Sequence, residues 1–186
     1  MSRRNKWILI VVIIGCLACG IAPVAYLGYS AVWAIRDLKS IEARRPVLLY
    51  ETDHRALLEA CRELSRQLAA GRLEPGWYRI HGDPDPESSQ FPQLILDIDP
   101  LQVIVEKSGQ VDIIMSPMVM FGVRAFPEDY EGSPAERFRY DDKAWGIELI
   151  DGLWYFDEDF HKRPEHKREV EELLRKRKTG DSSGVP

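Results

Sequence analysis

An uncharged apolar run from residue 7 to residue 35 follows a short basic leader, residues 1–6. A bilayer core about 30 Å thick requires roughly 20 apolar residues in a helix, and this run is longer. In lipid, a single segment satisfies its own backbone hydrogen bonds only as a helix. The run therefore predicts one transmembrane helix, which makes the lipid bilayer the first expected partner of the chain.

Aromatic residues stand at both ends of the predicted span. Trp7 lies at one end, and Tyr26, Tyr29 and Trp33 cluster near the other. Such side chains prefer the headgroup level of a membrane, and a rise of 1.5 Å per residue makes the step from Trp7 to Tyr26 roughly 28 Å. We expect residues 8–25 to cross the hydrocarbon core.

Three other interpretations compete with an uncleaved anchor. A cleaved signal peptide has an apolar stretch of about 7–15 residues, shorter than this run, and residues 28–30 offer its only passable cleavage site. A lipoprotein would be modified at Cys16, since residues 13–16 loosely resemble a lipobox, but the apolar residues continue well past that cysteine. A buried helix would need apolar partners that the rest of the chain does not supply. The anchor is favoured over all three.

The charges that flank the span do not fix its orientation. Three Lys or Arg residues precede it and four follow within residues 36–45, so the positive-inside rule gives no clear answer. A short basic leader before an N-terminal anchor favours a cytoplasmic N-terminus. We therefore expect a single-pass membrane protein whose C-terminal domain lies outside the cytoplasm.

The three cysteines predict packing roles. Cys16 and Cys19 lie inside the predicted span, where a redox or zinc site would lack water-accessible thiolates. Cys61 is the only cysteine beyond the span, so the domain has no internal disulfide, and its place on an apolar helix face predicts a core residue.

The charge balance excludes one class of partner. Residues 36–160 carry 14 basic and 25 acidic side chains, a net charge of −11. Nucleic-acid binding requires a basic face, so nucleic acid is not an expected partner. Residues 161–186 carry 8 basic and 5 acidic side chains, and this mixture predicts a solvated helix.

Apolar periodicity predicts the secondary structure of the soluble part. Residues 53–70 repeat apolar residues at helical spacing, with Thr52 or Asp53 as the cap and Gly71 as the stop. Period-two alternation predicts strands from residue 101, from residue 111 and from residue 119, and a short strand lies at 77–80. Residues 145–150 and 153–156 flank Asp151-Gly152, a strong hairpin turn.

Short connections make these strands antiparallel, and the helix must bury its stripe against them. The predicted fold class is α+β: an N-terminal transmembrane helix, then one small domain with an amphipathic helix packed on an antiparallel β-meander. The expected organisation is a basic leader at 1–6, an anchor at 7–35, a juxtamembrane connector at 36–50, a soluble domain at 51–160, a charged helix at 161–178 and a disordered tail at 179–186.

No residue set predicts catalysis, a cofactor or a metal site. The acidic loop with Asp83, Asp85 and Glu87 lacks the glycine and the distal glutamate of a calcium loop. The His161 to His166 spacing does not match a zinc helix, and Pro164 interrupts it. An acidic cluster, residues 157–159, remains as the basis of an alternative enzymatic function.

The most distinctive local sequence is the aromatic hairpin of residues 145–156. Alternate residues of a strand face opposite sides, so Trp154 and Phe156 share one face and Tyr155 faces the other. One face is expected to fill the core. The aromatic side chains of whichever face is exposed could anchor a partner, so Trp145, Trp154 and Tyr155 are candidate binding residues.

Two functions follow from these observations. The favoured one is a non-enzymatic, membrane-anchored protein. Its small domain binds or positions a partner, such as another protein, at the membrane surface. The alternative is an envelope-facing hydrolase that uses the acidic cluster. A shallow surface with exposed Trp or Tyr would favour binding, and a deep pocket with two convergent carboxylates would favour the enzyme.

Overall fold

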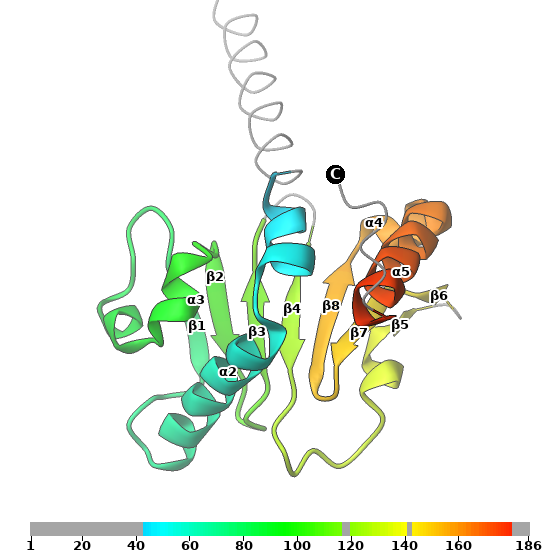
Figure 1. Ribbon diagram of the computed structural model, residues 1–186. Coiled ribbons are helices and arrows are strands. Elements are labelled where there is room, and N and C mark those ends of the chain that lie inside the picture. The colour runs from blue at the N-terminus through cyan, green and yellow to red at the C-terminus, as the bar shows by residue number, and fades with distance from the viewer. Residues whose placement is uncertain (1–42, 117–119, 141–142, 180–186) are drawn as a thin grey trace, which may run out of the picture. The chain divides into compact units, whose positions relative to one another are not determined.

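The computed structural model describes residues 43–116, 120–140 and 143–179 (Figure 1). The predicted leader, anchor and first half of the connector lie outside these residues, as does all of the predicted tail after Thr179. The described residues belong to one compact unit, Ile41–Pro186. Within them, no helix has the length and apolar character that a membrane crossing needs.

A six-stranded antiparallel sheet forms the centre of this unit, with strand order β1-β2-β3-β4-β8-β7. The first four strands form a meander, as predicted, but the final hairpin joins the sheet through its second strand, so that β8 lies beside β4. The strands are β1 (Gly76–Arg79), β2 (Gln102–Val105), β3 (Val111–Ile114), β4 (Phe121–Ala125), β7 (Gly146–Ile150) and β8 (Leu153–Asp157). A separate two-stranded pair is formed by β5 (Arg139–Tyr140) and β6 (Lys143–Ala144).

Helices pack on the sheet, which confirms the α+β class. Figure 1 shows α2 and α5 in front of the strands. The helical elements are the π-helix η1 (Val47–Glu51), α2 (His54–Ala69), the 3-10 helix η2 (Pro86–Gln90), α3 (Gln93–Asp97), the 3-10 helix η3 (Pro134–Phe138), α4 (Asp159–Lys162) and α5 (Pro164–Thr179).

Helix α2 is the amphipathic helix predicted over residues 53–70. The Asp53 carboxylate accepts hydrogen bonds from the backbone N–H groups of Arg55 and Ala56 at 2.9 and 3.2 Å, which satisfies two donors that a helix start leaves unpaired. Gly71 follows the helix at φ +66°, a conformation that favours glycine. The buried stripe consists of Leu57, Leu58, Ala60, Cys61 and Leu64, so the predicted core role of Cys61 is confirmed.

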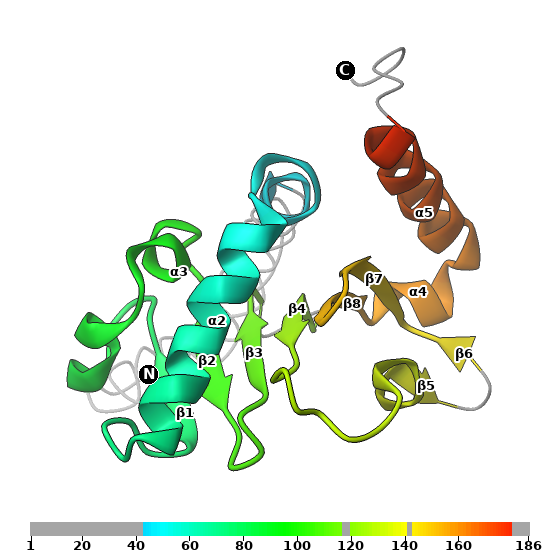
Figure 2. The ribbon, with the colours of Figure 1, turned by 60° about the horizontal axis from the view of Figure 1, so that its bottom comes forward.

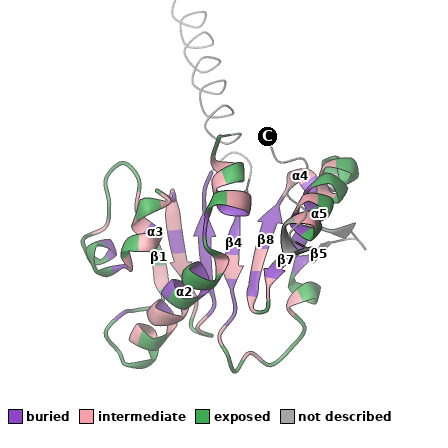
Figure 3. Ribbon diagram, viewed as in Figure 1, coloured by how far each residue is buried: buried purple, intermediate pink, exposed green. Residues whose placement is uncertain are grey.

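The face of the sheet that α2 covers holds the main core. One row of registered neighbours crosses five strands: Val103, Ile113, Val123 and Tyr155 have no exposed surface, and Tyr78 at the end of the row is 7 % exposed. Figure 3 shows this burial along the strands. Val170 and Leu174 of α5 join the same cluster. Burying an aliphatic or aromatic side chain of this size contributes about 1.5–3 kcal/mol.

The opposite face of the sheet holds a second, aromatic cluster. It consists of Ile114, Phe126, Phe138 and Phe156, with Trp145 and Trp154 partly buried against it. The Arg124 guanidinium lies 5.1 Å from the Phe138 ring centroid and pairs with Asp112 through two bonds of 2.6 and 2.7 Å. A Cβ atom on Gly146 would collide with the Phe138 ring, so glycine is required where this ring crosses the strand.

The aromatic cluster covers only part of this face. Trp77 of β1 stands opposite Ile104 of β2, and its side chain remains 73 % exposed. The strand that the sequence placed at 77–80 therefore presents a large aromatic side chain to solvent.

Candidate functional site

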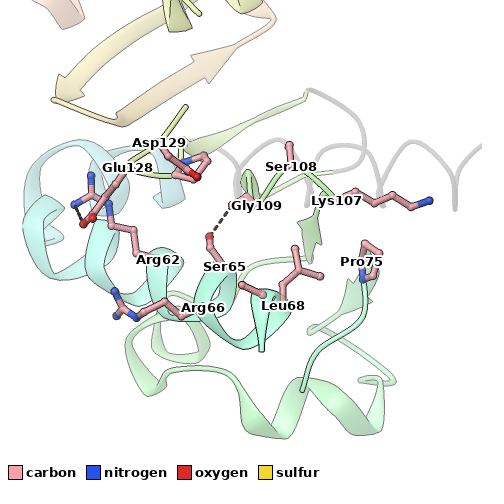
Figure 4. A pocket seen from close by; sticks show the side chains of 12 residues that line it. Arg62, Ser65, Arg66, Leu68, Pro75, Lys107, Ser108, Gly109, Glu128 and Asp129 are labelled. Carbon is pink, nitrogen blue, oxygen red and sulfur yellow. Dashed lines mark hydrogen bonds and ion pairs between the residues drawn. The ribbon is translucent and has the colours of Figure 1, made fainter. Parts of the chain in front are cut away.

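A surface hollow of about 730 Å³ lies beside the turn between β2 and β3 (Figure 4). We call it the turn hollow. The C-terminal half of α2, the turn at residues 107–109, the loop at 127–129 and Pro75 line it. Leu68, Ala69 and Pro127 contribute apolar surface, and charged side chains surround it.

Short polar contacts hold the walls of the turn hollow in place. The Ser65 hydroxyl on α2 donates to the Gly109 carbonyl at 2.6 Å, which ties the helix to the β2–β3 turn. Gly109 itself has φ +83°, so the turn favours glycine there. Arg62 pairs with Glu128 at 3.2 Å, and both residues line the hollow. The hollow is thus a preformed surface with apolar walls and a charged rim, the composition typical of sites that bind a polypeptide segment.

The structure separates the three predicted binding residues. Trp154 stacks on Phe138 at 5.2 Å between ring centroids with an interplanar angle of 13°, and Trp145 contacts the same ring edge-on at 5.4 Å. Both Trp side chains are half-buried on the aromatic face. Tyr155 has no exposed surface and lies in the main core on the other face. The predicted alternation is confirmed, and the binding role of these residues stays a prediction.

Asp157, at the end of β8, belongs to a buried ionic network that we call the Arg45 cluster: Arg45, Tyr155, Asp157 and Asp159. The Asp157 carboxylate has no exposed surface and lies 2.9 Å from Arg45 Nε and 3.2 Å from Nη2. It also accepts hydrogen bonds of 2.9 Å from the Tyr155 hydroxyl and from the Asp159 backbone N–H. Arg45 Nη2 contacts the Asp159 carboxylate at 2.7 Å.

Burial dominates the electrostatics of this cluster. Desolvation raises the pKa of Asp157 although the Arg45 guanidinium opposes the change. Burial, together with the neighbouring Asp157, raises the pKa of the Tyr155 hydroxyl well above its ordinary value. Two members of the predicted acidic cluster, Asp157 and Asp159, are thus held by Arg45, and Asp157 is closed to solvent.

The sequence does not predict the Arg45 cluster, because Asp157 and Asp159 lie 112 and 114 residues after Arg45 in the chain. Arg44 makes a similar distant contact: its guanidinium binds the Asp99 carboxylate at 3.1 Å and the Asp99 carbonyl at 3.0 Å. Both arginines belong to the segment predicted as a connector. Leu48 and Leu49 of the same segment are buried in the main core, so residues 44–49 are held firmly by the domain.

The acidic loop also has a structural role. The Asp85 carboxylate accepts the Arg79 backbone N–H at 2.6 Å, and the Asp85 N–H donates to the Arg79 carbonyl at 3.0 Å. Asp85 thereby occupies part of the outer edge of β1. Among the described residues, no group of three or more His, Cys, Asp or Glu side chains is placed to hold a metal ion.

Comparisons with family models, with curated proteins and with solved structures found no match for this chain.

Proposed function

We propose that this protein is a membrane-anchored binding module. In this proposal residues 7–35 hold the chain in the bilayer, and the α+β domain binds or positions a protein partner at the membrane surface. The domain faces the outside of the cytoplasm, and its principal contact surface is the turn hollow.

The observation that carries the proposal is the attachment of residues 44 and 45 to the domain. Only residues 36–43 separate the predicted span from Arg44. Arg44 and Arg45 are fixed by ion pairs to Asp99, Asp157 and Asp159. Because Arg44 and Arg45 belong to the folded domain, the linker to the predicted span is at most eight residues long, and a short linker supports a function that depends on where the domain is held.

The hydrolase alternative receives less support. General acid–base catalysis requires a carboxyl group that reaches substrate. Asp157 is fully buried and its oxygens are occupied by Arg45, Tyr155 and the Asp159 backbone. The turn hollow, with its apolar walls and charged rim, supports the binding function instead.

Fractionation of cells with full-length protein that carries a C-terminal tag tests the location. We expect the tag in the membrane fraction, resistant to alkaline extraction, and cleaved by protease once the outer barrier is opened. A chain that lacks residues 1–35 should leave the membrane. A tag that stays protected until the inner membrane is lysed would reverse the proposed orientation.

A photo-crosslinking amino acid at Lys107 tests the turn hollow in living cells, with Arg168 on the exposed surface of α5 as the matched control position. We expect a discrete adduct from position 107 and none from position 168. Ala69→Arg, which places a long side chain in the hollow, should abolish the adduct. Equal adducts at both positions, or an adduct unaffected by Ala69→Arg, would contradict the assignment of the hollow.

A further inference from the structure

The outer edge of β7 borders a second hollow, of about 470 Å³, which we call the edge groove. Gly146, Ile147 and Glu148 of β7 line it along the strand. One wall comes from residues 133–138, including η3, and the other from Lys167 and Glu171 of α5. Figure 2 shows β7 at the rim of the sheet, with α5 above it and β5 below it.

The backbone of β7 directs hydrogen-bonding groups toward this groove, and no other described strand pairs with them. Asp157 N–H donates to the Trp145 carbonyl, so residues 145 and 147 direct backbone groups toward β8. In an antiparallel pair this orientation alternates, which leaves the N–H and C=O groups of Gly146 and Glu148 directed away from β8. No strand lies beyond β7 in the six-stranded sheet that the described residues form.

The two edges of the sheet differ in this respect. At β1, Asp85 already satisfies the outward N–H and C=O groups of Arg79. Just before β7, the Trp145 N–H donates to the Phe138 carbonyl at 2.9 Å, and this pairing ends where the groove begins. Proteins commonly protect sheet edges against pairing with other chains. Among the described residues no strand pairs with the edge at Gly146–Glu148; Gly146 and Ile147 are buried between the walls of the groove, Glu148 is exposed, and these walls would guide an incoming strand.

The charges of the groove define the occupant. Glu136, Glu148 and Glu171 line it, against a single cation, Lys167, which pairs with Glu171 at 3.5 Å. This surplus of carboxylates favours a positively charged segment. At about 3.3 Å per residue, three residues of an extended chain match the stretch from 146 to 148.

We propose that the edge groove binds an extended basic polypeptide segment, which adds to β7 as a seventh strand. Main-chain hydrogen bonds to Gly146 and Glu148 provide affinity, and Lys or Arg side chains opposite the groove glutamates provide specificity. This interaction goes beyond the proposed function and does not require the membrane anchor.

The test uses the full chain in non-ionic detergent and a capped, fluorescent ten-residue peptide of alternating Lys and Thr. We expect saturable binding by fluorescence anisotropy, together with slower hydrogen exchange at the amides of Gly146 and Glu148. Methylating the central backbone nitrogens of the peptide keeps its charge but removes its N–H donors, and should weaken binding by about tenfold or more, equivalent to about 1.4 kcal/mol.

Glu148→Lys should weaken binding by a similar factor, and Glu74→Lys provides the matched control. Both side chains are exposed, but Glu74 precedes β1, outside the groove. Because Glu148→Lys leaves the buried core unchanged, far-UV circular dichroism of the two variants should agree. Equal losses in both variants, unchanged affinity for the methylated peptide, or no saturable binding of the parent peptide would each overturn the proposal.

Discussion

Replacing Arg45 by Met removes the only arginine of the Arg45 cluster while preserving an unbranched side chain. The Asp157 carboxylate, which has no exposed surface, then loses the guanidinium contacts at 2.9 and 3.2 Å. It keeps the two hydrogen bonds of 2.9 Å from the Tyr155 hydroxyl and the Asp159 N–H. The result is a buried charge with two hydrogen bonds and no counter-ion.

The expected cost at pH 7.5 is about 3 kcal/mol in the free energy of unfolding. Removing one partner of a buried ion pair costs about 3–5 kcal/mol, and the two remaining hydrogen bonds of Asp157 place this case at the lower end. A domain of this size has a total stability of about 5–15 kcal/mol, so the loss is large and measurable.

This cost should depend on pH in a defined direction. Burial already raises the pKa of Asp157 above its ordinary value of 3.8, so the folded state holds this proton more tightly than the unfolded state. The stability that protonation provides is complete below the unfolded pKa and is lost as pH rises through the folded pKa. Without Arg45 the pKa rises further. The destabilisation should therefore be small near pH 4 and grow toward pH 7.5.

Urea unfolding of the full chain in detergent, followed by Trp fluorescence at several pH values, measures this difference. The double variant Arg45→Met, Asp157→Asn should recover more than half of the loss at pH 7.5, because a neutral amide needs no counter-charge. A loss that is independent of pH, or a double variant no more stable than Arg45→Met, would refute the role assigned to the cluster.

Burial raises the pKa of the Cys61 thiol to about 12, so mass mapping after iodoacetamide treatment at pH 8 should find Cys61 modified only in urea. Gly146→Ala forces a Cβ atom against the Phe138 ring and should lower the free energy of unfolding by about 1–3 kcal/mol. In the control Gly76→Ala, the nearest atom to the new Cβ is 3.9 Å away, so the cost should be below about 1 kcal/mol. A larger effect at Gly76 than at Gly146 would contradict this packing. Leu64→Ala should cost about 2–5 kcal/mol in urea unfolding with an unchanged m-value, because Leu64 has no exposed surface.

Local signals in the sequence predicted much of the fold. The capped stripe of α2 and the Asp151-Gly152 turn, where Gly152 has φ +83°, are determined by residues close together in the chain. Strand periodicity identified β2, β3 and β4 for the same reason. Strand order was not predictable in this way: the insertion of β8 beside β4 depends on which long-range pairing buries Tyr155 beneath the helix.

The candidate sites were less predictable. Aromatic character marked the hairpin, but the sequence did not show that Phe138, from a polar loop, would cover Trp154. The sequence predicts a strand at Trp77 but not its 73 % exposure, because nothing local reveals that this strand lies at the edge of the sheet. The turn hollow and the edge groove are each lined by side chains from elements far apart in the sequence, so no local motif predicts them.

The span of the Arg45 cluster along the chain has a consequence for the time course of folding. Its earliest member, Arg45, meets carboxylates at positions 157 and 159. A ribosome must therefore synthesise nearly the whole domain before Arg45 acquires its partners. Closing so long a loop is entropically costly until the strands between them have paired. We expect the segment around Arg45 to be the last part of the domain to become ordered, and nascent chains stopped before residue 157 to remain sensitive to proteases there.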